Sequence, residues 1–162
     1  MKLLAGFLLL ATPALAQEPA PVAVSAPEAN RALVRRYIDE VLSAGKLDLL
    51  DELLAPDFAD RTPGAPADSR GPGVIREAQQ RMRGVFPQVQ YTVEDLITEG
   101  DKVVARYTVR AATREAEGSP SRNVEITGIT IFRIADGKIR EAWIINDQIE
   151  MFRQLGFTLH PP

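Results

Sequence analysis

The segment from Val124 to Gln148, VEITGITIFRIADGKIREAWIINDQ, constrains the fold of this chain more than any other. Two runs rich in β-branched and aromatic residues lie on either side of Asp136-Gly137. An Asp-Gly pair between two such runs is typical of a two-residue β-hairpin turn. The segment therefore predicts a strand, a tight turn and a second strand.

Alternation along the second of these strands divides its side chains between two faces. One face is predicted to carry Ile139, Glu141, Trp143, Ile145 and Asp147, and the other to carry Lys138, Arg140, Ala142, Ile144 and Asn146. The first face holds the only Trp of the chain and ends in a carboxylate. It fits either the wall of a pocket or the edge of a core where Asp147 reaches the surface.

Length and composition exclude several classes of function. A chain of 162 residues is long enough for one domain. Cysteine is absent, which excludes a disulfide framework, a thiol nucleophile and a cysteine metal site. The single histidine, His160, lies in a Pro-flanked tail, so a histidine-based metal site is not expected. A net charge of −3 is not that of a typical nucleic-acid-binding protein.

The first sixteen residues have the form of a secretory signal peptide. Lys2 precedes an apolar run, Leu3–Ala11, and Ala14-Leu15-Ala16 is a small-x-small cleavage pattern. The apolar run is well short of the ~20 residues that span a bilayer, so no stable membrane anchor is expected. We predict cleavage after Ala16 and a secreted or periplasmic product. Residues 17–29, rich in Pro and Ala, predict a flexible tether.

The rest of the chain changes from a helical period to a strand period. Apolar spacing predicts three amphipathic helices, followed by strands, a polar connection, the hairpin and a last helical turn. Their expected ranges are 30–45, 48–54, 72–86, 88–97, 102–113, 115–122, 124–148 and 149–155. Helices first and hairpin-connected strands afterwards predict an α+β domain. We expect a curved antiparallel sheet that wraps around the three N-terminal helices and leaves a concave, partly apolar interior.

Several motifs together resemble the SnoaL-like polyketide cyclase, or ester cyclase, family of the nuclear transport factor 2-like superfamily. They are DFADRTPG at 57–64, RGP at 70–72, FP at 86–87, EGDKVVARYT at 99–108, FRIADGKIREAWIINDQ at 132–148 and the RQLGF that closes 147–157. The resemblance covers residues 30–157, and 158–162 form a tail. It implies a cone-shaped α+β barrel with a deep pocket. That superfamily contains cyclases, isomerases, epoxide hydrolases, dehydratases and non-catalytic binders.

The resemblance also implies a mechanism. Cyclases of this family use an acid/base Asp, without metal or cofactor, for an intramolecular aldol closure of a polyketide ester. The Asp of the family's WxxxD pattern corresponds to Asp147. Two family histidines are replaced, one by Thr113 and the other by Arg61, and the usual PTG turn reads Ser119-Pro120-Ser121.

Each candidate site residue has a structural alternative. Burial beside Trp143 would disfavour the charged form of Asp147 and suit it to act as a general base, but Asp147 would equally suit the cap of the last helix. Trp143 is either a ligand platform or a core residue. Tyr91 and Tyr107 either donate hydroxyl groups into the pocket or are half-buried strand residues with solvated tips.

Charged residues complete the set of candidates. Asp60 and Arg61 form either a pair that orients an anionic or carbonyl substrate at the pocket mouth or a solvated surface pair. Arg106 and Arg110 share a strand face that is predicted to be solvated or to form a dimer surface. Glu141 opposite such arginines would form a cross-strand ion pair.

Three functions follow as hypotheses. The first is an exported SnoaL-like protein with a hydrophobic pocket for a small carbonyl or polyketide-like compound, with Asp147 as acid/base and without a cofactor. The second is a non-catalytic binder of a small hydrophobic molecule. The third is a homodimeric interaction protein in which Ile129, Ile131, Ala142 and Ile144 supply apolar contacts on the outer sheet face.

Overall fold

A computed structural model describes residues 26–66, 68–115 and 120–158. The predicted signal peptide, residues 17–25 of the predicted tether and His160 lie outside the described residues. The helices, in chain order, are α1 (Ala26–Arg36), the π-helix η1 (Tyr37–Ser43), the 3₁₀-helix η2 (Leu47–Leu49), α2 (Leu50–Leu53), α3 (Pro72–Val85) and α4 (Gln148–Gln154). The strands are β1 (Leu54–Asp60), β2 (Gln88–Glu99), β3 (Lys102–Ala112), β4 (Asn123–Ala135) and β5 (Lys138–Asn146).

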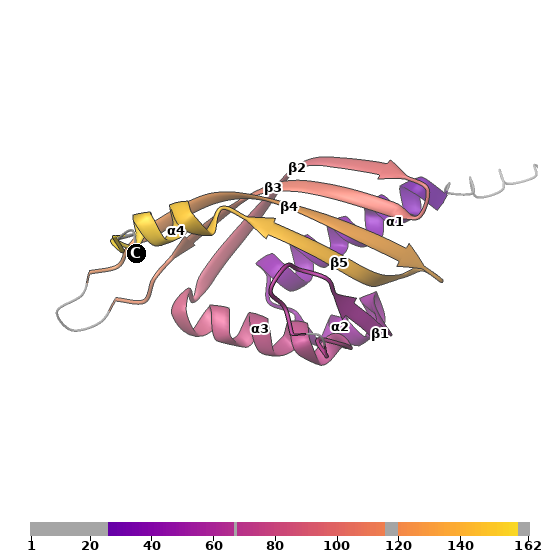
Figure 1. The fold of residues 1–162 in the computed structure, drawn as a ribbon, viewed down its shortest axis with the longest axis horizontal. Helices are drawn as coiled ribbons and strands as arrows, with labels where there is room; N and C mark the ends of the chain where they lie inside the picture. Colours follow the sequence, from indigo (N-terminus) through magenta and orange to yellow (C-terminus); the bar gives the residue numbers. More distant parts are fainter. Residues whose placement is uncertain (1–25, 67, 116–119, 159–162) are drawn as a thin grey trace, which may run out of the picture.

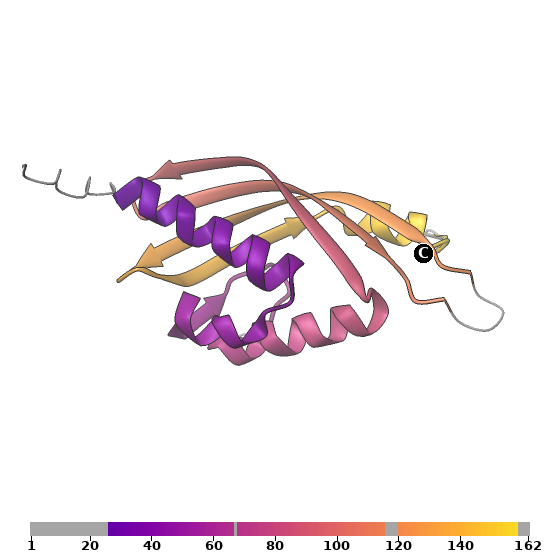
Figure 2. The same cartoon turned by 180° about the vertical axis from the view of Figure 1, so that it is seen from behind.

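One five-stranded sheet, with the order β1-β5-β4-β3-β2, forms the body of the fold. Helix α1 crosses one face of this sheet, α3 lies below its strands, and α4 lies at the far end of β5 (Figures 1 and 2). The sheet bends around the helices but does not close, because β1 and β2 remain as its two edges. The predicted α+β class is therefore confirmed.

The predicted hairpin joins β4 and β5. Asp136 and Gly137 have φ angles of 53° and 69°. Two successive positive φ angles are the requirement of a type I′ turn, which Asp-Gly meets at low steric cost. The hairpin prediction is therefore confirmed.

Strand β1 departs from the expected order of elements. Leu54–Asp60 lies between the second and third predicted helices and forms a strand parallel to β5. Phe58 is almost completely buried in this strand. Burial of such side chains explains why the chain leaves α2 directly for the sheet edge. Helix α1 begins at Ala26, so the expected start of the first helix at residue 30 was wrong.

A bulge in β5 corrects the predicted face of the hairpin. Ile139 pairs with Ile134 and Glu141 with Arg133, which leaves Arg140 as an extra residue. An extra residue reverses the alternation beyond it. Ile139 is therefore fully buried on the helix-covered face of the sheet, called here the inner face, while Trp143 lies opposite Ile131 on the outer face. Grouping Ile139 with Trp143 was wrong.

The same correction applies to the expected apolar contacts of the outer face. Ala142 is buried and Ile144 packs against the core, so both face the helices. Ile129 and Ile131 do lie on the outer face, where their side chains are 46% and 36% exposed. The core thus lies between the inner sheet face and the helices, and its largest fully buried side chains are Phe58, Ile38, Leu50, Leu53, Leu54 and Ile139.

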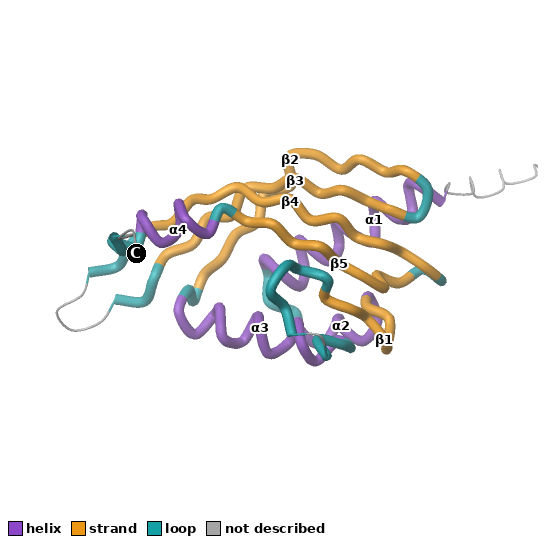
Figure 3. The backbone as a smooth tube through the Cα atoms, viewed as in Figure 1, coloured by secondary structure: helices purple, strands orange, loops and turns teal. Residues whose placement is uncertain are grey.

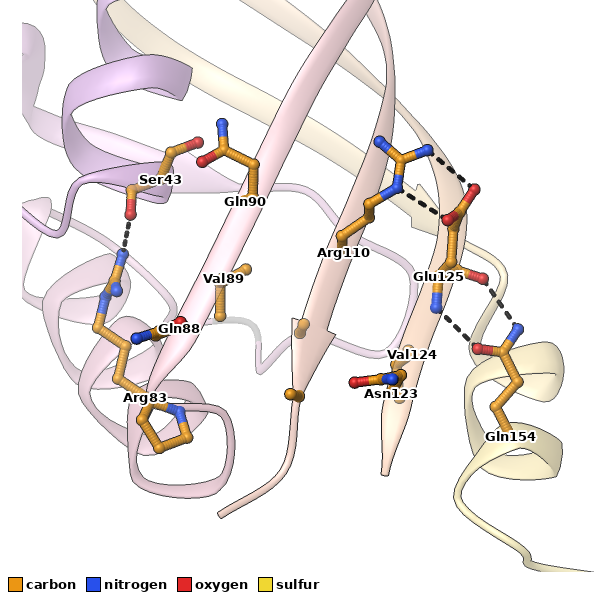
Figure 4. Close-up of a pocket in the computed structure, with 13 residues that line it drawn as sticks. Ser43, Arg83, Gln88, Val89, Gln90, Arg110, Asn123, Val124, Glu125 and Gln154 are labelled. Carbon is orange, nitrogen blue, oxygen red and sulfur yellow. Dashed lines mark hydrogen bonds and ion pairs between the residues drawn. The ribbon is translucent and has the colours of Figure 1, made fainter. Parts of the chain in front are cut away.

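Helix α4 is fastened to the sheet by one amide side chain. Gln154 accepts a hydrogen bond from the backbone N–H of Glu125 (2.7 Å) and donates one to the backbone carbonyl of the same residue (2.9 Å), as Figure 4 shows. Strand β5 ends before it reaches this part of β4. The Gln154 amide therefore satisfies backbone groups that a neighbouring strand would otherwise pair.

Gln154→Ala is expected to increase local opening of α4 roughly 30-fold, because the two hydrogen bonds to the Glu125 backbone, of about 1 kcal/mol each, are lost. Hydrogen exchange at the amides of Met151 and Leu155, both bonded within this segment, measures the change. Arg153→Ala is the control, since Arg153 is mostly exposed and pairs with Glu150 on the same helix. Equal exchange in the two variants would contradict the fastening role.

Candidate functional site

A partly enclosed cavity of about 180 Å³ lies between α3, α4 and the inner face of the sheet. Most of its lining is apolar, and none of the described lining residues is charged. The lining consists of Met82, Phe86, Val89, Tyr91, Val109, Ala111, Val124, Ile126, Asn146, Gln148 and Met151. An apolar cavity with a few polar groups is the usual form of a small-molecule site.

A hydrogen-bond chain orients the polar group that β5 supplies. The Tyr107 hydroxyl donates to Oδ1 of Asn146 (3.0 Å) and lies 2.9 Å from Oγ1 of Thr130. Because the phenol has one proton, Thr130 is the donor in its contact with Tyr107. With Oδ1 engaged in this way, the Asn146 amide group has its N–H donors left for other partners, and it forms no further hydrogen bond with the described residues.

Gly128 makes this chain possible. A Cβ atom at Gly128 would clash with Oδ1 of Asn146 and would lie 2.6 Å from Cε2 of Tyr107. Glycine at this inner-face position of β4 therefore lets the Tyr107 ring and the Asn146 amide meet over the strand. Close approach of side chains is one of the few reasons for a glycine within a strand.

The three tyrosines of the chain gather in the interior. The rings of Tyr91 and Tyr107 meet edge-on, with centroids 5.4 Å apart. Burial raises the pKa of Tyr37, Tyr91 and Tyr107, and the mutual repulsion of their charged forms raises those of Tyr37 and Tyr91 further. All three phenols are therefore neutral hydrogen-bonding groups at physiological pH. Tyr91 is one of the lining residues of the cavity, and its hydroxyl forms no hydrogen bond within the described part of the chain.

Asp147 lies outside the cavity, at the N-cap of α4. Its Oδ1 accepts a hydrogen bond from the backbone N–H of Glu150 (2.9 Å), and its own N–H donates to the Thr127 carbonyl (3.1 Å). The side chain is exposed. The burial beside Trp143 that would favour a general base is therefore not present, whereas the capping contact is.

Asp147→Ala is expected to cost about 1 kcal/mol of stability, because it leaves a backbone N–H of α4 without its cap. Asp147→Asn is the matched control, since Asn caps as well as Asp but removes the charge. Urea unfolding of the two variants measures the difference. A full loss in Asp147→Asn as well would show that charge, and not capping, is what stabilises this end of α4.

The remaining predicted residues lie at separate places. Trp143 is half-buried on the outer face. Asp60 ends β1 and accepts a hydrogen bond from the Thr62 N–H (2.9 Å). Thr113 ties the two ends of the 114–121 connection, because its N–H and its hydroxyl oxygen both bond to Arg122. Thus Tyr91 and Tyr107 are brought together, but of these predicted residues only Tyr91 lines the cavity; Tyr107, Trp143, Asp60 and Thr113 do not.

Arg61 pairs with Glu141 and not with Asp60. Its Nη2 lies 2.9 Å from Oε1 of Glu141, and Nε of Arg133 lies 2.6 Å from the other carboxylate oxygen. Hydrogen bonds from Arg133 first and Arg61 second lower the pKa of Glu141. The expected partners of Glu141 were Arg106 and Arg110, but these arginines pair with Asp95 and with Glu125. The Arg61–Glu141–Arg133 cluster links β4 and β5 to the segment that follows β1, which Figure 3 draws as a teal loop.

Two further hollows lie on the surface. The larger is a broad polar hollow over the ends of β2, β3 and β4, with Gln88, Gln90, Arg110, Asn123 and Glu125 among its lining residues (Figure 4). The other lies on the outer face over Gly128, Ile129 and Ile145, with Arg106 and Asp147 at its border. Their openness to solvent makes both less able than the interior cavity to desolvate a small ligand.

Neither a membrane-spanning helix nor a group of metal-ligating side chains is found among the described residues. None of the described helices is long and apolar enough to cross a membrane. Within residues 26–66, 68–115 and 120–158, no three His, Cys, Asp or Glu side chains are grouped as metal ligands.

Comparison with known proteins decides the family. The model of the SnoaL-like polyketide cyclase family matches residues 32–155. The chain belongs to the SnoaL-like polyketide cyclase family. A search of curated proteins returned no match.

Several solved structures resemble this chain over most of its length. TsrD from Streptomyces laurentii is 30% identical, with a TM-score of 0.67 over 79% of this chain and 95% of its own. IdmH, a candidate polyketide cyclase from Streptomyces antibioticus, is 30% identical, with a TM-score of 0.70 over 79% and 99%. A candidate polyketide cyclase from Bacillus cereus is 26% identical, with a TM-score of 0.71 over 84% and 87%.

Sequence reasoning missed much of the cavity of this SnoaL-like chain. Asn146, Thr130 and Gly128 were not singled out, nor were the helix residues Met82 and Met151. One signal was available in β4, where Glu125, Thr127 and Arg133 alternate with apolar residues and so mark the solvent face. Pairing that strand with β5 would have assigned Asn146, and not Trp143, to the inner face.

Proposed function

We propose that this SnoaL-like protein binds a small, neutral, largely apolar carbonyl compound in the interior cavity. The observation that supports the proposal is an apolar cavity lined by Tyr91 and Asn146, whose hydroxyl and amide N–H groups donate no hydrogen bond to any described residue. Both groups suit a carbonyl oxygen, which is an acceptor only. The absence of charge among the described lining residues favours a neutral ligand.

The Thr130–Tyr107–Asn146 hydrogen-bond chain orients the amide group that would bind the carbonyl oxygen of the ligand. Tyr107 holds the amide oxygen of Asn146, so the amide nitrogen is directed elsewhere without an entropy cost at the moment of binding. A hydrogen bond in a largely desolvated site discriminates against ligands that lack the acceptor, because the protein donor is then left unpaired. The cavity therefore combines apolar affinity with selectivity for a carbonyl group.

Isothermal titration of acetophenone into the wild type and Asn146→Leu tests this function. The variant keeps the approximate size of the side chain but loses the donor, and we expect binding to weaken roughly 3-fold to 10-fold. Asn123→Leu makes the same chemical change at an exposed position of the polar surface hollow and serves as the control. Binding that is unchanged in Asn146→Leu would contradict the carbonyl assignment.

Family membership favours a second function, acid/base catalysis of an aldol ring closure with Asp147 as the catalytic group. Asp147 lies within the matched region, at the end of the WxxxD pattern, and next to Asn146 of the cavity lining. Turnover of polyketide-like esters by wild type and Asp147→Asn tests it. The variant preserves the α4 cap, so a loss of rate would report the carboxylate itself, and equal rates would exclude this role.

The outer sheet face suits a homodimer. Ile97, Ile129, Ile131 and Ile145 are 64%, 46%, 36% and 59% exposed there. Two ion pairs, Arg106–Asp95 and Arg110–Glu125, place both positive and negative charges on the same face. A second copy could therefore meet this face without like charges facing each other. Sedimentation of wild type and Ile145→Glu tests this contact. A wild type that remains monomeric at micromolar concentration would exclude it.

Export is part of the proposal, because residues 1–16 have the features of a signal peptide. N-terminal sequencing of the protein from its native compartment is expected to begin at Gln17. A protein that retains Met1 would contradict export by this route.

A further inference from the structure

We infer that the interior cavity accepts carbonyl compounds of single-ring size and rejects fused multi-ring compounds. This inference rests on the proposed function, since it concerns the ligand of the same cavity. Its basis is the size of the cavity and the stiffness of the sheet wall, which are independent of the hydrogen-bond donors.

The cavity volume sets the size limit. The space is about 180 Å³. An apolar protein cavity of roughly 150 Å³ is enough to hold one benzene ring, whereas clefts for drug-sized ligands are roughly 300–1,000 Å³. One ring with a short acyl substituent therefore fits the space, and two or three fused rings do not fit without movement of the walls.

The sheet side of the cavity is a poor candidate for such movement. Val89, Val109, Val124 and Ile126 form this wall, and each is no more than 8% exposed. These side chains are β-branched and stiff at χ1, and they lie on three adjacent strands of a continuous ladder. Expansion in this direction would require displacement of packed backbone.

The helix side contains the adaptable side chains. Met82 extends from α3 and Met151 from α4, and both are partly buried against the core. Methionine has three side-chain torsions and fills irregular space, so its conformation can adjust to a ligand. Such adjustment moves the side chain but does not remove its volume, so the length of Met82 and Met151 sets the upper size limit, and shortening one of them should admit a larger ring system.

The methionines also provide the measurement. The chain has three, and the third is Met1. Met-methyl-labelled protein, titrated separately with acetophenone, 2-acetylnaphthalene and 2-acetylanthracene, reports occupancy by NMR from the two cavity methyls. We expect saturable shifts with acetophenone, and binding of the two larger ketones that is roughly 10-fold to 100-fold weaker, because overfilling a packed space is unfavourable.

Met151→Ala should restore binding of 2-acetylnaphthalene to within about threefold of acetophenone, with Ile149→Ala as the control. Ile149 is on the same helix, is 65% exposed and does not line the cavity. Met82 is present in both variants, so its methyl reports binding in each. Tightest binding of the larger ketones to wild type would overturn the size limit while leaving the proposed function intact. No shift with any of the three ketones would instead overturn the proposed function, and with it this inference.

Discussion

Replacing Gly128 with Ala is expected to lower the free energy of unfolding by about 3 kcal/mol and to abolish ketone binding in the cavity. The added Cβ would overlap Oδ1 of Asn146 and would lie 2.6 Å from Cε2 of Tyr107. Both neighbours are held by their hydrogen bond to each other. Relief of the clash must break that bond or shift β4 within a packed core.

The sign of this effect separates it from the usual effect of glycine replacement. Where the backbone conformation permits it, Gly→Ala commonly stabilises a protein by about 0.4–1 kcal/mol, because it restricts the unfolded chain. Gly128 is not among the glycines with positive φ, so its backbone does not forbid Ala. The expected loss therefore arises from the missing space alone.

Gly84→Ala is the matched control. Gly84 lies in α3, lacks positive φ, and a Cβ there would have open space around it. We expect this control to be neutral or more stable than wild type in urea unfolding. If Gly128→Ala were as stable as Gly84→Ala and bound acetophenone normally, Tyr107 and Asn146 would not depend on the space that Gly128 provides.

The hairpin and the fold class could be predicted because their determinants are local. Asp136-Gly137 specifies the turn, and the change from helical to alternating periodicity marks the boundary between the helices and the sheet. The parallel pairing of β1 with β5 could not be predicted in this way. It joins residues 54–60 to residues 139–142, and only the assembled sheet edge brings them together.

The faces of the strands were harder to predict than the strands themselves. The extra residue Arg140 in β5 and a second bulge at Glu94 in β2 each reverse the alternation beyond them. Simple alternation from Val89 would place Ile97 on the inner face, but Ile97 is 64% exposed on the outer face. A bulge is selected by the pairing of two strands, so periodicity within one strand does not reveal it.

Only part of the candidate site could be predicted, because strand alternation fails beyond a bulge. Alternation placed Tyr91 correctly because it precedes the bulge of β2, and Tyr107 correctly because β3 itself pairs with β4 without a register shift. Asn146 was correctly predicted to lie on the other face of β5 from Trp143, but the face of Trp143 was taken as the possible pocket wall. The role of Asp147 as catalyst stays a prediction, since the structure establishes its capping contact and not its chemistry.

Alkaline pH is expected to destabilise the protein steeply, because three tyrosines are buried as neutral phenols. Burial is the main cause that raises the pKa of Tyr37, Tyr91 and Tyr107 above the ordinary value near 10. In the unfolded chain these phenols ionise near pH 10, whereas in the folded chain they stay protonated. Stability from these groups is therefore complete below pH 10 and is lost as the pH rises above it.

The size of the effect follows from the number of protons released on unfolding. Each tyrosine that ionises only in the unfolded state lowers the free energy of unfolding by about 1.4 kcal/mol per pH unit, so three together give about 4 kcal/mol per pH unit above pH 10. Urea unfolding between pH 9 and pH 11.5, with phenolate absorbance recorded in parallel, measures this slope. Phenolate absorbance and loss of secondary structure are expected to appear together.

Tyr107→Phe provides the control for the alkaline slope, because it keeps the ring that packs against Tyr91 and removes one ionisable group. The variant should lose stability at neutral pH, since Asn146 and Thr130 lose their hydrogen-bond partner, yet its slope above pH 10 should fall by about one third. A structural defect alone would lower the whole curve without changing its slope. Phenolate absorbance from three tyrosines in protein that is still folded would contradict the burial that underlies both this prediction and the neutral donors of the cavity.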